Sequence, residues 1–147
     1  MSKKLNLKII TPEKLVLEEE VDQVTLPTIT GEITVLADHI PIVTALTSGD
    51  IVAKNSGEDI PFAVVGGFIE VKKNKGKTEI AILADFAEHV SEISDKKITE
   101  AKATAEKLKK QAANNEIVDF EHFESELERS LTRVRIADKW RKKKYRK

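Results

Sequence analysis

The sequence predicts an α+β fold, in which an N-terminal β-sandwich or barrel is followed by a C-terminal antiparallel hairpin of two helices. Up to Ala84, apolar residues recur with a period of two or in short runs, and turn residues interrupt them at short intervals. After Asp85, glycine and proline are absent and Ala, Glu, Lys and Leu dominate. We therefore expect residues 1–86 to form the sandwich and residues 87–147 to form the hairpin and a basic tail.

The predicted strands follow one another closely. Residues 5–10 show the alternating pattern, and residues 15–17, 21–26 and 31–36 resume it after breaks. Glycine and asparagine tolerate the positive φ of tight reversals, so Gly-containing segments predict hairpin-type turns. These segments are residues 48–50, 55–59 and 74–76. Many short strands with turns at this spacing are typical of a sandwich or barrel.

The two helices are predicted from apolar side chains at three- and four-residue spacing. Ser94 and Asp95 can cap the first helix and Asp119 the second, with a break at residues 114–116. The expected facing stripes are Ile98, Ala101, Ala105, Leu108 and Ala112, and Phe120, Phe123, Leu127, Leu131, Val134 and Ala137. An Ala-rich seam buries little apolar area, so we expect the hairpin to be marginally stable alone and able to dock or extend.

Charge is distributed unevenly along the chain. Lys and Arg balance Asp and Glu at 25 each, so the whole molecule has no field that points to nucleic acid or an acidic substrate. From Arg129 to Lys147, however, there are ten basic residues and one acid, Asp138. The tail at residues 139–147 also carries two aromatic residues. It is either a solvated helix end or a contact for an acidic protein, RNA or anionic lipid.

Several classes of protein are excluded by what the chain lacks. With no cysteine, it has no disulfide framework, thiolate zinc site or cysteine nucleophile. The histidines, His39, His89 and His122, are dispersed without metal-ligand spacing, so we expect no metal site and no cofactor. We identify no signal peptide and no run of about 20 apolar residues that could cross a bilayer. No convergent set of polar residues indicates an enzyme.

Two glycine motifs are interpreted as backbone features. The segment Gly76-Lys77-Thr78 ends like a phosphate-binding loop, but it lies in a predicted turn, and Val71 occupies the position where that motif needs its first glycine. The pair Gly66-Gly67 lies inside an apolar strand region. We therefore expect a bulge or a close backbone approach at Gly66-Gly67 rather than a nucleotide site.

Two longer motifs carry a resemblance to a known family. Residues 31–46, with Gly49 after them, consist of a Gly-Glu strand, a His-x-Pro turn and a Thr-x-Leu strand. Residues 66–71 are a Gly-Gly-aromatic-x-Glu-Val strand, and residues 82–85 give a Leu-Ala-Asp ending. Together with the helical hairpin, these motifs resemble the epsilon subunits of F-type ATP synthases over nearly the whole chain.

The resemblance implies a sandwich of about ten strands. It also implies a non-catalytic rotor subunit that couples proton flow to ATP synthesis, whose sandwich binds the gamma stalk and the c-ring. Glu32 and His39 occupy signature positions at the loop end of the sandwich, so we expect them at or near those contacts. Thr34 stands where the family usually has glycine, and Ala37-Asp38 where Pro-Gly is common. The expected location is the cytoplasmic face of a bacterial membrane, reached only through the complex.

Some members of the family bind ATP in the folded hairpin through an Ile/Leu-Asp-x-x-Arg-Ala motif. The matching residues here are Ile98, Thr99, Lys102 and Ala103, and Glu88, Arg129 and Arg133 align with further positions of that site. Thr99 replaces the motif's acid and Lys102 its arginine, which exchanges a bidentate fork for a point charge. We therefore expect weak or absent ATP binding.

The second helix is expected to inhibit ATP hydrolysis. In the family, this helix extends along gamma, and its basic residues meet an acidic segment of the beta subunit among the alpha and beta subunits. The matching residues are Arg129, Arg133, Arg135 and Lys139, most of which can share one flank. The alternative is a free-standing β-sandwich module that binds RNA or anionic lipid through its basic tail.

Overall fold

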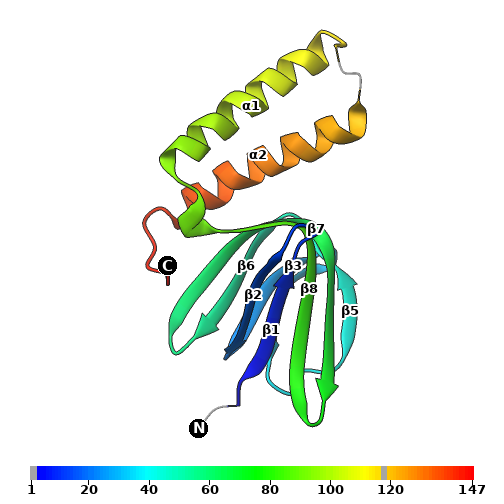
Figure 1. The fold of residues 1–147 in the computed structure, drawn as a ribbon, viewed down its shortest axis with the longest axis vertical. Helices are drawn as coiled ribbons and strands as arrows, with labels where there is room; N and C mark the ends of the chain where they lie inside the picture. The colour runs from blue at the N-terminus through cyan, green and yellow to red at the C-terminus, as the bar shows by residue number, and fades with distance from the viewer. Residues whose placement is uncertain (1–2, 117–118) are drawn as a thin grey trace.

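The computed structural model describes residues 3–116 and 119–147, and it confirms the predicted fold class. A β-sandwich forms the N-terminal part, and two antiparallel helices lie across one end of it (Figure 1). The N-terminus lies at the opposite end from the helices, whereas the C-terminus returns to the side of the sandwich near the helix junction. The side chain of Phe120 lies outside the described residues.

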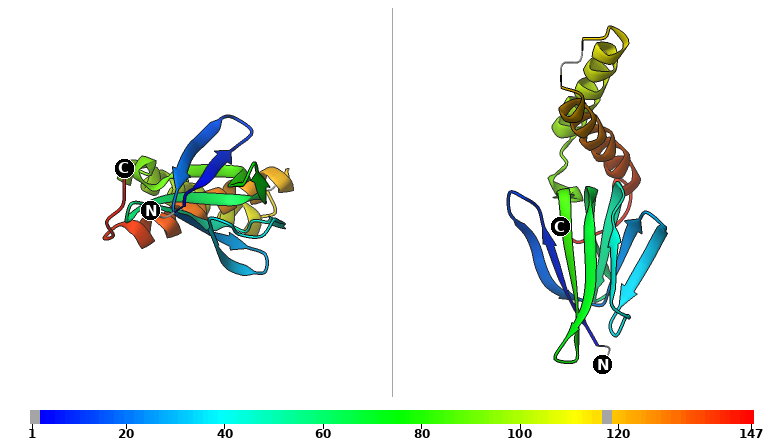
Figure 2. Two further views of the ribbon diagram at one scale, coloured as in Figure 1. Left: turned by 90° about the horizontal axis from the view of Figure 1, so that it is seen from below. Right: turned by 90° about the vertical axis from the view of Figure 1, so that its right-hand side faces the viewer.

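Eight strands are formed by the described residues, where about ten were expected, and two of the eight are long. The strands are β1 (Leu5–Ile10), β2 (Leu15–Val21), β3 (Gln23–Thr28), β4 (Gly31–Leu36), β5 (Ile42–Ala45), β6 (Gly49–Asn55), β7 (Glu58–Asn74) and β8 (Lys77–His89). Their order is β2-β1-β8-β7-β6-β3-β4, with β5 paired to β7. The first part of β7 pairs with β6 and the later part with β5, so β7 belongs to both layers of the sandwich (Figure 2).

The long strands change layer at Gly66-Gly67. Both residues have positive φ, +59° and +117°, which side-chain-bearing residues rarely adopt. A Cβ built on Gly67 would lie 2.0 Å from the Leu83 carbonyl oxygen on β8. The predicted close backbone approach is therefore confirmed at this pair.

The core lies between the two layers and is formed by the alternate residues of each strand that point inward. Leu5, Leu7 and Ile9 of β1 are fully buried, and Ile80 and Ile82 of β8 face the same interior. Burying each such side chain contributes about 1.5–3 kcal/mol. The sandwich therefore has a continuous apolar core of its own, which does not depend on the helices.

The helices begin where the sequence predicts. A short 3-10 helix, η1 (Val90–Glu92), leads to α1 (Asp95–Ala113), and α2 runs from Phe120 to Trp140. The Ser94 hydroxyl accepts a hydrogen bond from the Lys97 N–H at 3.2 Å, and the Asp119 carboxylate accepts one from the His122 N–H at 3.1 Å. Both predicted N-caps are thus confirmed.

The facing stripe predicted for α2 is partly wrong. Leu131 is 42% exposed, whereas Ser130 is buried and lines the space between the two helices. Successive residues of a helix are turned by about 100°, and α2 lies between α1 and the sandwich, so it buries two faces. Thr132, Ile136 and Trp140 are buried away from the Ser130 face. Leu131 falls on the remaining, exposed side.

An apolar cluster joins α2 to the sandwich. Ile136, Ala137 and Trp140 pack with Ala63 of β7, and Val90, Ile93 and Ile98 of the η1–α1 segment complete the cluster. Ala63 is therefore covered on the outer face of β7, while its neighbours Phe62 and Val64 belong to the core. Burial on both faces explains why this part of β7 is apolar without alternation.

Candidate functional site

The outer face of the layer β2-β1-β8-β7-β5 carries an exposed apolar band. Cross-strand pairing aligns Leu15 with Ile10, Ile10 with Leu83, Leu83 with Phe68, and Phe68 with Ala45. Leu15, Leu83 and Phe68 are 52–60% exposed. A contiguous apolar strip across five strands has no structural use on a free surface, and such patches mark protein interfaces. We call these five residues the apolar band.

The apolar band was missed by the sequence analysis, although the sequence contains a signal for it. Three neighbouring strands each carry an apolar doublet, Ile9-Ile10, Phe68-Ile69 and Ile82-Leu83. In each doublet one residue is buried in the core, and its neighbour must point to the other face. Adjacent apolar residues that point to both faces of a strand, where no helix covers the outer face, therefore indicate a docking surface.

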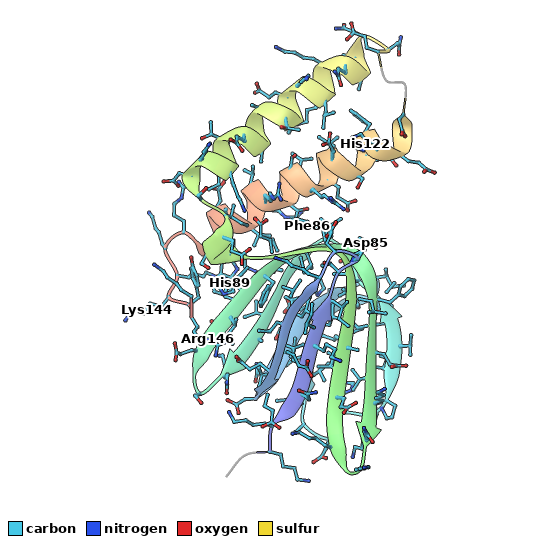
Figure 3. The ribbon with its side chains drawn as sticks, in the orientation of Figure 1. Asp85, Phe86, His89, His122, Lys144 and Arg146 are labelled. Atoms are coloured by element: carbon cyan, nitrogen blue, oxygen red, sulfur yellow. The ribbon has the colours of Figure 1, made fainter. Side chains whose placement is uncertain are left out.

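A charged cluster lies where the helices meet the sandwich. The Glu88 carboxylate on β8 is 3.3 Å from an Arg133 guanidinium nitrogen and 3.4 Å from Lys97 Nζ. The Arg133 and Arg129 guanidinium carbons lie 4.8 and 5.4 Å from the centre of the Phe86 ring, which is at the top of the sandwich beneath α2 (Figure 3). The sandwich thus holds two arginines of α2 through one acid and one aromatic ring.

A second polar contact fixes the end of α2. The Asp50 carboxylate on β6 accepts a hydrogen bond from the Trp140 indole N–H at 2.8 Å and lies 2.8 Å from Lys139 Nζ. The Asp50 side chain is only 11% exposed, so this carboxylate is directed into the contact. Of the four cations expected to meet the beta subunit, Arg129, Arg133 and Lys139 face the sandwich and Arg135 is exposed.

His89 lies at the hinge between β8 and η1 (Figure 3). Its Nδ1 accepts a hydrogen bond from the Ser91 N–H at 3.0 Å, and its ring packs edge-on against Phe62 with centroids 5.1 Å apart. Burial is the main cause that lowers the pKa of His89 below 6.5, and the backbone of Arg146 and then the Glu92 carboxylate oppose the shift. The neutral imidazole therefore suits this hinge.

Glu32 and His39 do not share one end of the sandwich, which corrects that part of the sequence interpretation. Glu32 pairs with Pro27 at the start of β4, whereas His39 follows the end of β4. A strand rises about 3.3 Å per residue, so the part of β4 from Glu32 to Leu36 spans roughly 13 Å before the turn that carries His39. Asp38, beside His39, adopts φ +68°, and its carboxylate pairs with Lys3 and Lys73.

A family model for the β-sandwich domain of the ATP synthase delta/epsilon chain matches residues 4–90. The chain belongs to the epsilon family of ATP synthase subunits. The ATP synthase epsilon chain of Nitratidesulfovibrio vulgaris is 40% identical over 136 residues, which cover 92% of this chain and 97% of that one. The epsilon chain of Desulforamulus reducens is 37% identical over 138 residues, which cover 94% and 100%.

A solved structure has the same fold as this epsilon-family chain. A chain in the cryo-EM structure of the Euglena gracilis mitochondrial ATP synthase matches with a TM-score of 0.61 at 22% identity, covering 92% of this chain and 78% of that one. Family membership favours the epsilon interpretation over a free-standing RNA or lipid module. None of the helices in the described ranges is both long and apolar enough to cross a membrane.

The residues aligned with the family's ATP site are only partly brought together. Glu88, Arg129 and Arg133 meet at the helix junction, and Ile98 is buried in the nearby apolar cluster. Lys102 and Ala103 are exposed on α1 and do not line the pocket between the helices there. That pocket is lined by Lys97, Glu100, Ala101, Thr104, Glu126, Arg129, Ser130 and Arg133.

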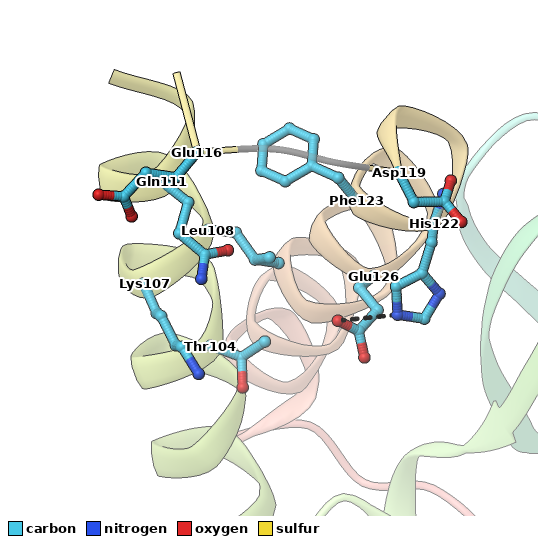
Figure 4. A pocket seen from close by; sticks show the side chains of 9 residues that line it. All are labelled: Thr104, Lys107, Leu108, Gln111, Glu116, Asp119, His122, Phe123 and Glu126. Atoms are coloured by element: carbon cyan, nitrogen blue, oxygen red, sulfur yellow. Dashed lines mark hydrogen bonds and ion pairs between the residues drawn. The ribbon is translucent and has the colours of Figure 1, made fainter. Parts of the chain in front are cut away.

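A larger cavity of about 490 Å³ opens at the far end of the hairpin (Figure 4). Leu108 and Phe123 line it together with His122 and Glu126, which lie 3.6 Å apart. Among the described residues, no group of three or more His, Asp or Glu side chains is arranged to hold a metal ion. The cavity is lined by both apolar and polar side chains.

Proposed function

We propose that the chain is a non-catalytic rotor subunit of a proton-translocating ATP synthase, which couples proton flow to ATP synthesis and restrains ATP hydrolysis through its helices. One observation carries the regulatory part: the cations Arg133 and Lys139 of α2 are paired with Glu88 and Asp50 of the sandwich. The same cations cannot pair with an acidic segment of another subunit at the same time. Docking on the sandwich and inhibition are therefore mutually exclusive.

Coupling is assigned to residues 1–86. The apolar band supplies a rigid apolar face for the gamma stalk, because it lies on paired strands rather than on a loop. Glu32 and His39, at the two ends of β4, then lie near the gamma and c-ring contacts at separate places.

Regulation is assigned to residues 87–147. In the docked position Phe86, Glu88 and Asp50 of the sandwich occupy Arg129, Arg133 and Lys139, so these cations are already paired when the alpha and beta subunits approach α2. On extension, these cations and the exposed Arg135 become available to the beta subunit. Charge complementarity gives this second docking its orientation and makes it sensitive to salt.

Deletion of the residues beyond Asp119 tests this assignment in the assembled enzyme. The sandwich retains its own core, so assembly with gamma and the c-ring should be unchanged, and ATP hydrolysis should rise. Equal hydrolysis by the deleted and full-length enzymes, with and without nucleotide preincubation, would remove the inhibitory role and leave coupling alone.

ATP binding is expected to be weak or absent. Glu88 already pairs with Arg133 and Lys97, and Lys102 lies outside the pocket between the helices. A nucleotide would have to displace these ion pairs without gaining the motif's carboxylate. Isothermal calorimetry on the full chain should give no heat at micromolar ATP, and a micromolar Kd would contradict this.

The expected location is the cytoplasmic face of a bacterial membrane, where the chain is peripheral and held through the complex. The rival function as an RNA or lipid module predicts that the isolated chain binds RNA or anionic vesicles with strong salt dependence, lost with the basic tail. Copurification with gamma and c-ring subunits, without such binding, separates the two.

A further inference from the structure

The chain beyond α2 does not continue into solvent as a frayed helix. After Trp140 it turns, with the Lys143 N–H donating to the Trp140 carbonyl at 3.2 Å. Tyr145 then packs near the rings of Trp140 and His89, each with centroids 6.0 Å away. The segment thereby runs from the end of α2 down the side of the sandwich, past the hinge.

Arg146 attaches this segment to two different strands. Its backbone N–H donates to the Asp59 carbonyl of β7 at 2.7 Å, and its guanidinium lies 2.7 Å from the Glu19 carboxylate of β2. The two side chains are 36% and 27% exposed, so the pair is partly shielded from water. Lys144, in contrast, points away from the sandwich (Figure 3). Arg146 is therefore bound to the sheet at two points, whereas Lys144, two residues before it, does not contact the sheet.

Beneath the segment lies a hollow with apolar walls and a charged and polar rim. It is a cavity of about 230 Å³, with Val16, Leu17, Phe62 and Ala87 among its apolar lining residues. Its polar lining residues are Lys14, His89, Ser91, Glu92, Arg146 and Lys147. Val16, Leu17 and Ala87 are partly buried against the main core. The segment thus covers the corner of the sandwich where β2 ends the sheet, and its departure would expose apolar edge to water.

We propose that residues 141–147 form an intramolecular latch, which fastens the helical hairpin in its docked position by tying the end of α2 to β2 and β7. The latch rests on the proposed regulatory function, since it holds the state in which α2 is sequestered. It assigns that task to residues 141–147. The latch acts in addition to the Asp50 and Glu88 contacts, because it attaches to different strands.

The chemistry of the latch allows release. Its ion pair is partly exposed and therefore weakened by salt, whereas the apolar contacts of Ile136 and Trp140 are not. Because the latch closes a short segment whose other end is already held at Trp140, little chain entropy is lost when Arg146 binds. The docked hairpin should therefore loosen as ionic strength rises.

Amide hydrogen exchange of the full chain tests the latch through two variants with the same change of charge. In Arg146→Ala, exchange in the last two turns of α2 and in β2 should be roughly two- to fivefold faster than in the parent, whereas Lys144→Ala should leave both unchanged. Truncation after Arg141 should accelerate the same amides by about tenfold. The exchanged pair Glu19→Arg with Arg146→Glu should restore protection toward the parent value.

The outcomes separate the latch from the proposed function. Unchanged exchange in both Arg146→Ala and the truncated chain would overturn the latch, whatever the enzyme does. Equal acceleration in the Lys144→Ala control would also overturn the latch, because the loss of any positive charge in this segment would then explain the effect. Accelerated exchange with unaltered ATP hydrolysis in the assembled enzyme would support the latch and remove the inhibitory role of the hairpin.

Discussion

Asp50→Asn tests how the sandwich holds the end of α2. Asparagine preserves the shape of the side chain but removes the charge that pairs with Lys139 and that strengthens the bond from the Trp140 indole. Converting a charge-assisted hydrogen bond to a neutral one costs about 1 kcal/mol. The half-exposed Lys139 contributes at most about 1 kcal/mol more. The docked state should therefore lose about 1–2 kcal/mol, so the undocked fraction rises about 5- to 30-fold.

Two readouts follow this equilibrium in the full chain. Amide exchange in the second half of α2 should accelerate by the same factor, while exchange in β1 and β8 stays at the parent rate. Trp140 is the only tryptophan and is 4% exposed, so acrylamide quenching of its fluorescence should increase on undocking.

Asp138→Asn is the matched control, since Asp138 lies on α2 but pairs only with Arg141 within the described chain. It should leave both signals unchanged. Unaltered α2 exchange in Asp50→Asn, or an equal effect in Asp138→Asn, would refute the role of Asp50. In the assembled enzyme, Asp50→Asn should lower ATP hydrolysis, because it frees α2 to inhibit.

Three further predictions concern the sandwich and the hinge. Phe68→Ser should weaken binding to purified gamma about tenfold or more without changing thermal stability. Leu36→Ser is the control, because Leu36 is similarly exposed but lies outside the apolar band, and it should leave gamma binding unchanged. Equal loss of binding in both variants would refute the role of the apolar band. Gly67→Ala should destabilise the chain in urea unfolding by at least about 3 kcal/mol because its Cβ meets backbone, while Gly76→Ala, also at positive φ but in open space, should cost about 1 kcal/mol. The pKa of His89 is lowered in the folded chain, so the unfolded chain takes up its proton first and stability should fall as pH drops below 6.5. In thermal melts at several pH values, His89→Gln should remove this contribution to the dependence of stability on pH.

The fold was predictable where local chemistry and burial agree. The alternation of Leu5, Leu7 and Ile9 matches their burial, and the disappearance of glycine and proline after Asp85 precedes the helices. Gly66-Gly67 was interpreted correctly because consecutive glycines inside an apolar strand have few other structural uses. The separation into strands was less predictable, since Gly66-Gly67 bends β7 without ending it and β8 follows the bend with no glycine or proline of its own.

The candidate site was less predictable because it depends on which faces are left uncovered. Leu131 was placed in the helix seam, but α2 buries one face on α1 and another on the sandwich, and a single-stripe analysis cannot identify two faces. The same limit applies to Phe68 and Leu83, whose parity indicates the outer face without saying what covers it. Glu32 and His39 were placed together because motif spacing does not report that an entire strand lies between them.

Favourable and unfavourable contributions to docking meet on the surface between the hairpin and the sandwich, which suits the hairpin to act as a switch. Ile136 and Trp140 contribute apolar burial, yet the surface they share with the sandwich also buries Nε of Arg129 and Arg133 and one carboxylate oxygen of Glu88, without hydrogen-bond partners among the described residues. Each buried polar atom of this kind offsets about 1–3 kcal/mol of that burial and recovers water on opening. The net preference for docking is therefore smaller than the apolar contribution alone. An acidic partner, salt and the release of Arg146 each act on the polar contacts of this surface and would shift the position of α2 in the same direction.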